Sequence, residues 1–323
     1  MISPRSIIAG CGSFLPGKIV TNDDLAKQID TSDSWIKERT GIHQRHIAVE
    51  GETSATMGTQ AALKAMEAAK VTASDIDLII VATTTPDQIF PSTATRIQSA
   101  LKVKQGAAFD IQAVCSGFVY ALAVADNFIK CGQSKTALVI GSDTMSRILD
   151  WQDRATCVLF GDGAGAVVVR ASNTENGNGR GVISTHLYSD GDFGDILYVD
   201  GGVSTGAIGK IRMAGSEVFR HAVQKMSNSV QQALDGNELT VDDIDILIPH
   251  QANVRILDAV AKKLGIPQEK VMITVADHAN TSAASIPLAM DVAVREGRIK
   301  EGDLVVIEAL GGGLTWGTAL IRW

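Results

Sequence analysis

Apolar residues in this sequence fall into short continuous runs that alternate with longer helical segments, a pattern typical of α/β proteins. Thr53 to Ala69 has the period of an amphipathic helix, whereas the segment after Cys115, ending at Gly132, has apolar residues on every face. Such a helix is buried between other layers or crosses a membrane, and this one is too short to cross a bilayer. The pattern therefore predicts a buried central helix, together with strands at Ile7 to Gly12, within Val71 to Ile80, and at Ala107 to Ile111, Lys135 to Asp143 and Phe160 to Arg170.

The pattern occurs twice. The block VTASDIDLII (Val71 to Ile80) returns as LTVDDIDILI (Leu239 to Ile248), 168 residues later. Later segments match the remaining strands and the buried helix of the first half: Val271 to Val275, Asn280 to Val294, Gly302 to Leu310 and Leu314 to Trp323. We therefore expect two similar halves, residues 1–171 and 182–323, joined by a polar, Asn- and Gly-rich linker at residues 172–181.

Each half combines strands and helices in an order that implies a mixed sheet with helices on its faces. A helix that is apolar all round needs cover on both sides, and two halves packed through their central helices supply it. This predicts a five-layer α-β-α-β-α architecture. Cys115 and Asn280 should then lie at matching helix N-termini in the two halves and face a shared cleft.

The composition narrows the class of protein. With 45% hydrophobic and 20% charged residues and a net charge of −7, the chain is typical of a globular enzyme and gives no overall attraction to nucleic acid or anionic membranes. The N-terminus lacks the apolar core of a signal peptide, and no segment is long enough to span a membrane. The four cysteines have no CxxC spacing and no zinc-like cluster. We expect a cytoplasmic protein without metal or resident cofactor.

Three features suggest chemistry. Cys115 stands at a helix N-terminus, where unpaired N–H groups and the helix dipole favour a thiolate; the alternative is a small buried apolar residue. His250 follows a strand, at the edge where open sheets place active sites; the alternative is a structural histidine. The turn Gly311 to Gly313 is either a plain hairpin or a source of N–H groups for an oxyanion.

The motifs AVCSGF, PHQAN followed by Arg255 and Ile256, NTSAAS and GGG before Thr315-Trp316-Gly317 resemble those of β-ketoacyl-acyl carrier protein synthase III, a family of the thiolase superfamily. TSDSWIKERTGI near the start and FGDGAGA in the middle match as well, so the resemblance runs essentially end to end. It implies a thiolase fold, a homodimer and a ping-pong condensation. An acyl group passes from acyl-CoA to a cysteine, and malonyl-acyl carrier protein is then decarboxylated and condensed.

Mapped by motif, the resemblance makes Cys115 the acylated nucleophile, with His250 and Asn280 as donors to the malonyl thioester carbonyl. The N–H groups of Cys115 and Gly312 would form the oxyanion hole. Phe90 would reach across the dimer interface to close an acyl pocket shared with Leu310, which suggests a short primer such as acetyl.

The resemblance also implies two binding regions. Trp35 and Arg154 match the pair that stacks on the adenine of coenzyme A, and Arg39 matches a phosphate contact. A basic rim should attract the acidic acyl carrier protein despite the net negative charge, with the cations Arg220, Arg255 and Lys262. For Trp35, Arg39 and Arg154, the alternative is that they are ordinary solvated surface residues.

Departures from the family pattern leave substrate choice open. Ala279 stands where the family usually has glycine, and Leu310 and Leu314 replace common aromatic residues. One alternative is a relative that joins acyl-CoA to another acceptor in secondary metabolism. Others are a cysteine hydrolase, although the papain-type signature is absent around Cys115, and a non-catalytic partner subunit.

Overall fold

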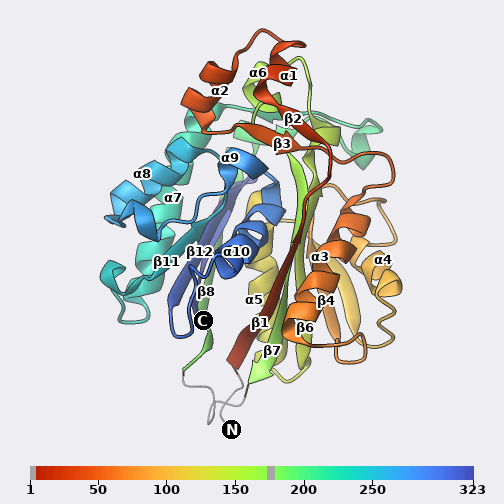
Figure 1. The fold of residues 1–323 in the computed structure, drawn as a ribbon, viewed down its shortest axis with the longest axis vertical. Coiled ribbons are helices and arrows are strands. Elements are labelled where there is room, and N and C mark those ends of the chain that lie inside the picture. The colour runs from red at the N-terminus through yellow and green to blue at the C-terminus, as the bar shows by residue number, and fades with distance from the viewer. Residues whose placement is uncertain (1–4, 173–178) are drawn as a thin grey trace.

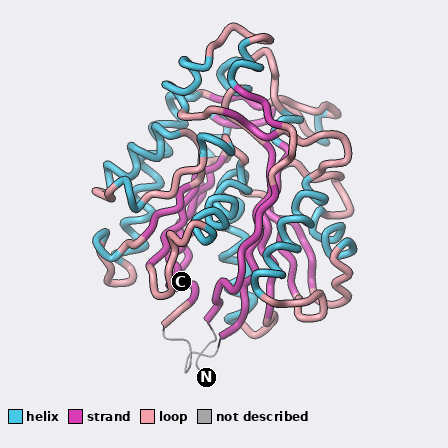
Figure 2. The backbone as a smooth tube through the Cα atoms, viewed as in Figure 1, coloured by secondary structure: helices cyan, strands magenta, loops and turns pink. Residues whose placement is uncertain are grey.

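The computed structural model describes residues 5–172 and 179–323 and contains two mixed β-sheets with helices between and outside them (Figure 1). Most of the linker expected at residues 172–181 lies outside the described residues. Figure 2 shows the two sheets as separate groups of strands, with helices packed in the space that divides them. The α/β class with mixed sheets predicted from the sequence is confirmed.

The first sheet has the strand order β1-β7-β6-β4-β5. β4 is parallel to β5 and β6, whereas β7 is antiparallel to β6 and β1. Its central strands are buried along their length, as expected for a sheet covered on both faces. The strands are β1 (Arg5–Phe14), β4 (Leu78–Ala82), β5 (Ala107–Ile111), β6 (Thr136–Thr144) and β7 (Asp162–Ser172).

The second sheet has the order β11-β12-β13-β8, with β11 parallel to β12 and the other pairs antiparallel. Its order and strand directions repeat those of four strands of the first sheet, β4-β6-β7-β1. The strands are β8 (Gly181–Ser189), β11 (Ile246–Pro249), β12 (Leu304–Gly311) and β13 (Thr315–Arg322).

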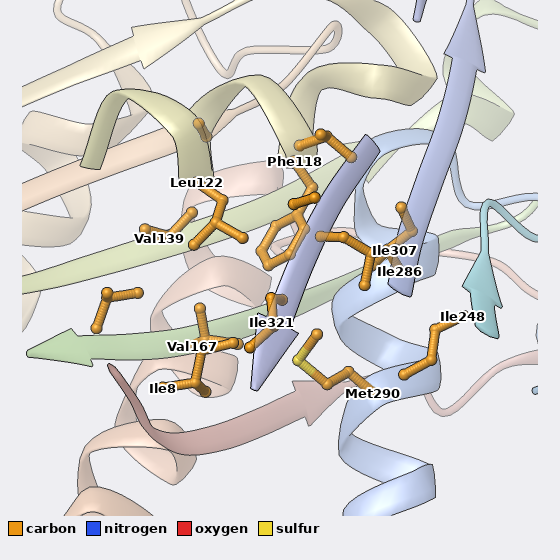
Figure 3. Packing of buried hydrophobic residues seen from close by; sticks show 14 of the residues in the cluster. Ile8, Phe118, Leu122, Val139, Val167, Ile248, Ile286, Met290, Ile307 and Ile321 are labelled. Atoms are coloured by element: carbon orange, nitrogen blue, oxygen red, sulfur yellow. The ribbon is translucent and has the colours of Figure 1, made fainter. Parts of the chain in front are cut away.

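Two central helices, α5 (Gly117–Lys130) and α10 (Ser285–Arg295), lie between the sheets. Figure 3 shows Phe118 and Leu122 of α5 among side chains of both sheets, with Ile286 and Met290 of α10 in the same cluster. These four side chains are at most 1% exposed. This core is the reason for the apolar faces of the central helix, because each face of α5 meets another apolar layer.

The outer layers are helical. α3 (Ser54–Ala69) and α4 (Thr93–Ala100) cover the first sheet, and α7 (Gly215–Asp235) and α8 (Val254–Leu264) cover the second. The alanine-rich α3 approaches β1 so closely that a Cβ atom at Gly12 would lie within 2.7 Å of the Lys64 side chain and overlap the helix backbone. Together with the sheets and the central helices, these outer helices complete the five layers.

Short elements gather at one end of the molecule, at the top of Figure 1. They are β2 (Ile19–Thr21), α1 (Asn22–Ala26), α2 (Asp33–Thr40), β3 (Gln44–His46), α6 (Arg154–Cys157), β9 (Leu197–Val199), β10 (Ile211–Met213) and α9 (Val275–His278). Short 3-10 turns occur at η1 (Val114–Ser116), η2 (Met145–Ile148), η3 (Gly191–Ile196), η4 (Val203–Thr205), η5 (Val241–Asp243), η6 (Gln268–Lys270) and η7 (Ser282–Ala284). No helix in the described ranges is both long and apolar enough to cross a bilayer.

The strand registers fix how the halves correspond. Leu78 pairs with Ala137 in the first sheet and Ile246 pairs with Val305 in the second, and each partner is 168 residues after its counterpart. The same offset relates Cys115 to Ala283, and the residues before them, Val114 and Ser282, have similar positive φ angles of 47° and 52°. The expectation that Cys115 and Asn280 occupy matching positions is therefore wrong by three residues, because Asn280 precedes the turn that corresponds to that of Cys115.

One predicted strand does not form. Val271 makes a single parallel bridge to Leu247, and the chain from there to Val275 is not part of a sheet. The buried side chain of Gln251 accepts hydrogen bonds from the N–H groups of Thr274 and Val275, and its amide donates to the carbonyl of Met272. Because Gln251 satisfies these backbone groups, they are not available to a neighbouring strand.

Candidate active site

A cavity of about 990 Å³ opens at the end of the molecule where the short elements gather, and residues of both halves line it. Its wall is mainly apolar, with polar groups at a few positions, as is typical of a ligand site. The cavity brings together eight of the residues predicted from the sequence, Trp35, Arg39, Cys115, Arg154, His250, Arg255, Asn280 and Leu310.

Cys115 lies in η1, between β5 and α5, and is 4% exposed. Burial raises the pKa of its thiol to about 12, and the charge of Asp143 acts in the same direction. The hydroxyl of Ser282 lies beside both groups and lowers the pKa of each, without reaching good hydrogen-bond geometry to either. The expectation of a resting thiolate is wrong for the free chain, because burial outweighs the effect of the helix N-terminus.

His250 follows β11 directly, as the sequence predicted, and its N–H donates to the carbonyl of Glu308 over 2.8 Å. Its Nδ1 lies 2.6 Å from Oγ of Ser285, which also accepts the N–H of Gln251 over 3.3 Å. Burial lowers the pKa of His250 to about 3, so the ring is neutral near pH 7. Since Ser285 can donate its hydroxyl proton to Nδ1, we assign the Nε2–H tautomer, in which Nε2 is a hydrogen-bond donor.

Asn280 is held in place by the other half. Its N–H donates to the carbonyl of Leu159, and its own carbonyl accepts the N–H of Gly161, both over 2.9 Å. Its side-chain Oδ1 accepts the N–H of Ser282 over 2.9 Å, which leaves the amide Nδ2–H groups as the donors of this cavity-lining residue. The preceding Ala279 has φ 57° and ψ −163°, a conformation that glycine adopts much more readily than alanine.

The glycine turn joins β12 to β13 as a hairpin, and it packs against the turn that carries Cys115. A Cβ atom at Gly311 would lie 2.7 Å from the backbone nitrogen of Cys115. Oγ1 of Thr315 donates to the carbonyl of Ala113 over 3.0 Å, which ties the two turns together. Gly312 is not among the residues that line the cavity.

At the cavity mouth, two guanidinium groups lie over the ring of Trp35, that of Arg154 at 4.7 Å and that of Arg39 at 5.4 Å from its centre. Both arginines are exposed, whereas Trp35 is half-buried. Arg154 also donates to the carbonyl of Asp30 over 2.8 Å. An aromatic face and two cations at one rim suit a planar, phosphate-bearing ligand group.

Four predicted residues lie apart from this cavity. Gly312 does not line it, and neither do the exposed cations Arg220 and Lys262, although Arg255 does. Phe90 is also outside the cavity of its own chain, and its side chain is 82% exposed. A role for these four residues in binding therefore stays a prediction.

Sequence reasoning missed Ser285, Ser282 and Asp143, which surround the three central residues. Two of them belong to the NTSAAS motif, so their presence was visible, but their partners depend on how the halves pack. Within residues 5–172 and 179–323, no group of three or more His, Cys, Asp or Glu side chains could hold a metal ion.

Comparisons with known proteins agree with this arrangement. Residues 109–191 match the family described as 3-oxoacyl-[acyl-carrier-protein] synthase III, and residues 234–323 match its C-terminal family. The chain is 62% identical to the β-ketoacyl-[acyl-carrier-protein] synthase III of Paramagnetospirillum magneticum, over 98% of this chain and 99% of that protein. It is 60% identical to the protein of the same name from Rhizorhabdus wittichii, over 99% of each chain.

Solved structures give the same result. The 3-oxoacyl-[acyl-carrier-protein] synthase III of Aquifex aeolicus superimposes with a TM-score of 0.93 at 48% identity, covering 98% of this chain and all of that one. The priming β-ketosynthase of the R1128 polyketide pathway has the same TM-score at 34% identity, covering 99% of this chain and 97% of that one. The chain therefore belongs to the β-ketoacyl-acyl carrier protein synthase III family and is an acyltransferase with a thiolase-like fold that catalyses the condensation initiating fatty acid synthesis.

Proposed function

We propose that this enzyme transfers an acyl group, acetyl in the first instance, from acyl-CoA to Cys115 and condenses it with malonyl-acyl carrier protein. One observation carries the proposal: Cys115 from the N-terminal half and His250 and Asn280 from the C-terminal half line a single cavity. A thioester bound there would meet a sulfur nucleophile and two neutral hydrogen-bond donors.

In the first half-reaction, the sulfur of Cys115 forms a bond to the thioester carbon of acyl-CoA and loses its proton. The bond to the CoA sulfur breaks, and the departing thiolate takes up a proton. Because burial raises the thiol pKa to about 12, we expect the proton to leave as the bond forms rather than beforehand. The N–H groups of Cys115 and Gly312 would stabilise the oxyanion of this step.

In the second half-reaction, the malonyl C–C bond breaks, CO2 leaves, and the electron pair remains as an enolate. Nε2–H of His250 and Nδ2–H of Asn280 would donate to the enolate oxygen. A neutral His250 suits this role, since its pKa of about 3 keeps the donor tautomer present at working pH. The enolate carbon then attacks the acyl group, and the Cys115 sulfur leaves and regains a proton.

The cavity mouth and the surface beside it suggest how the two substrates bind. CoA would bind at the mouth, where Trp35 offers an aromatic face and Arg154 and Arg39 offer cations for its adenine and phosphates. Arg255 lines the cavity, and with Arg220 and Lys262 it would attract an acidic carrier protein. The names of the relatives, which refer to an acyl carrier protein, support this acceptor.

A homodimer would complete the site. Ile89 and Phe90 are 72% and 82% exposed in the single chain, which is unusual for neighbouring large apolar side chains. In the proposed dimer, Phe90 enters the partner's acyl pocket near Leu310. Sedimentation should give twice the mass of one chain, and Phe90→Ser should alter the primer preference; a monomer with full activity would contradict this part of the proposal.

The test uses labelled acetyl-CoA followed by malonyl-acyl carrier protein. We expect label on Cys115 and then 3-oxoacyl-acyl carrier protein with release of CO2. Arg255→Glu should raise KM for the carrier protein, whereas the matched control Lys104→Glu, on an exposed loop, should not. Hydrolysis of acetyl-CoA alone would favour a hydrolase, and product formed only with a non-carrier acceptor would favour the secondary-metabolic alternative.

A further inference from the structure

A carboxylate lies buried at the contact between the two halves, behind the cavity. Asp143 is the last residue but one of β6 and is fully buried. Its Oδ1 accepts hydrogen bonds from the segment that follows β4: the N–H groups of Thr84 and Thr85 over 2.7 and 3.2 Å, and the hydroxyls of Thr83 and Thr85 over 3.2 and 3.0 Å. Its Oδ2 accepts the N–H of Ala283, in η7 of the C-terminal half, over 3.2 Å.

The repeat gives this contact a counterpart. With the offset of 168 residues, Asp143 corresponds to Gly311, and Ala283 corresponds to Cys115. Asp143 of the N-terminal half faces the Ala283 turn, and Gly311 of the C-terminal half faces the Cys115 turn. The two contacts are therefore equivalent by the repeat: in each, the end of a strand of one half packs against a turn of the other half. The residue at the strand end carries a carboxylate in one contact and has no side chain in the other.

The difference between aspartate and glycine affects what can bind to the N–H groups of each turn. Each turn begins a central helix and presents backbone N–H groups, which bind anions well. At the Ala283 turn, the carboxylate of Asp143 occupies that position. At the Cys115 turn, a Cβ atom on residue 311 would lie 2.7 Å from the backbone nitrogen, so glycine keeps the place free of any side chain.

We propose that Asp143 is a positioning residue. Its carboxylate is an internal anion at the Ala283 turn of the C-terminal half, and it occupies the place that, at the Cys115 turn, is left open for a substrate oxyanion. It fixes the η7 turn that follows Asn280 and the Thr83–Thr85 segment that borders the cavity, and its negative charge adds to the burial that keeps the resting Cys115 a thiol. The inference deepens the proposed function, since it takes Cys115 as the nucleophile and Asn280 as a donor.

The hydrogen bonds around Asp143 favour the ionised form of its carboxyl group. Five donors from the protein point at its two oxygens, and each favours the charged form. Burial raises the pKa of Asp143, and these hydrogen bonds oppose that effect. The hydroxyl of Ser282, which lies beside both Asp143 and Cys115, places the two groups close together in the same buried region.

Two other buried titratable groups, on β12 and at the end of β11, differ in charge from Asp143. His250, at the end of β11, is neutral near pH 7 because burial lowers its pKa to about 3. Glu308 of β12 is uncharged in the same range, because burial raises its pKa to about 8. Asp143 is the charged group that raises the pKa of Cys115. Removing its charge should therefore lower the pKa of the Cys115 thiol. Because loosening of the fold would reduce burial and act in the same direction, the variant is compared with a control that removes another buried carboxylate.

The experiment measures the pH profile of Cys115 alkylation by iodoacetamide in the full-length enzyme, without substrate. In Asp143→Asn, the profile should move to lower pH, and a thiol pKa that is lower by one makes alkylation at a fixed pH about tenfold faster. The matched control is Asp162→Asn, which removes another buried carboxylate, the first residue of β7, which accepts hydrogen bonds from Ala48 and Ser146. Its profile should match the wild type.

A second readout addresses positioning. In Asp143→Asn, the new amide would either turn an N–H group toward Ala283 or lose the Thr83–Thr85 contacts. Either change would misplace Asn280, so the rate of malonyl decarboxylation should fall about tenfold or more. The alkylation assay involves neither CoA nor carrier protein. A failure of the proposed condensation therefore leaves the alkylation result intact, and the two ideas can fail separately.

Several outcomes would overturn the proposal. An unchanged alkylation profile in Asp143→Asn would mean that no charge acts on the thiol, and slower alkylation at every pH would make Asp143 a proton acceptor instead. If the variant does not fold, hydrogen exchange of the wild type decides: the amides of Thr84 and Ala283 should be protected and should open together. Rapid exchange of the Ala283 amide while that of Thr84 stays protected would contradict the link between the halves.

Discussion

The turns at Cys115 and Ala283 have the same backbone and opposite surroundings. Both follow a residue with positive φ, both form a short 3-10 turn, and both start a central helix that is buried between the sheets. One turn carries a sulfur and faces a glycine, whereas the other carries a methyl group and faces a carboxylate. In the proposed account, the repeat preserves a place suited to an anion, and the side chains around it decide whether a substrate or the protein itself occupies that place.

The different roles proposed for the two halves follow from this difference between the turns. In the proposed account, the turn of the N-terminal half stays open and provides the thiol, whereas Asp143 of the N-terminal half closes the turn of the C-terminal half. The C-terminal half would provide His250 and Asn280, which line the same cavity. Each half also holds the other: Leu159 and Gly161 clamp the backbone of Asn280, and Thr315 binds the carbonyl of Ala113. A change at one turn should therefore affect one half-reaction more than the other.

Among variants that keep Cys115, Gly311→Ala should give the largest effect on acyl transfer, because it closes the open turn. The added methyl group would press on the Cys115 backbone, and a shift of about 1 Å in a reacting group can cost about 10² in rate. Acylation by acetyl-CoA should fall by that order, as measured in a rapid-quench assay. Gly17→Ala, where a Cβ atom would meet nothing within 4 Å, is the control; equal losses in both variants would contradict the comparison.

Acid should weaken the folded state through buried histidines of the C-terminal half. Burial lowers the pKa of His250 to about 3 and that of His278 to about 4, so these rings stay neutral in the folded chain and gain protons on unfolding below pH 6.5. The free energy of unfolding should therefore fall as the pH drops from 6.5 toward 4, by up to about 1.4 kcal/mol per pH unit for each histidine.

Urea titrations between pH 7.5 and 4.5 measure this slope. His278→Asn should reduce it, because one of the two groups that take up protons on unfolding is then missing. A slope that is the same in the variant and the wild type would show that His278 titrates in the folded chain at its ordinary pKa.

Ser285→Ala tests how the donor at His250 is set. Without the hydroxyl 2.6 Å from Nδ1, the ring can change tautomer and lose the Nε2–H donor. Malonyl decarboxylation should fall about tenfold, within the range of one hydrogen-bonded positioning contact, while acylation of Cys115 stays near the wild-type rate. Ser285→Thr, which restores the hydroxyl, should recover activity; no recovery together with normal folding would argue against the tautomer assignment.

Ala279→Gly should give the smallest effect, and it is stabilising. Ala279 adopts φ 57° and ψ −163°, which costs an alanine about 1–3 kcal/mol relative to an ordinary conformation. Glycine removes this strain but adds freedom to the unfolded chain, so the net gain in the free energy of unfolding should be about 1 kcal/mol. Thermal unfolding measures it, and a destabilised variant would show that the methyl group makes favourable contacts that exceed the strain.

Much of this could be predicted from the sequence, because it depends on local pattern. Apolar periodicity and the repeated block at residues 71–80 and 239–248 predict the strands, the buried α5 and the duplication. They also predict that His250 follows a strand. The motifs also named eight residues that the structure brings to one cavity.

What could not be predicted depends on contacts between distant segments. The exact register of the repeat required the strand pairing, and the unformed strand at Val271 required knowledge of where Gln251 points. The high pKa of Cys115 depends on its burial under the other half and on the charge of Asp143. These are properties of packing between halves, which a linear pattern does not contain.

The division between the halves can be tested most directly by measuring the two half-reactions separately in Cys115→Ala and His250→Ala. Acyl transfer is followed by mass spectrometry of the Cys115 peptide, and decarboxylation by labelled CO2 from malonyl-acyl carrier protein. We predict that Cys115→Ala loses acyl transfer but still releases CO2, whereas His250→Ala is acylated normally and decarboxylates about 10²–10³ times more slowly. Loss of both half-reactions in both variants, with folding intact, would contradict the account.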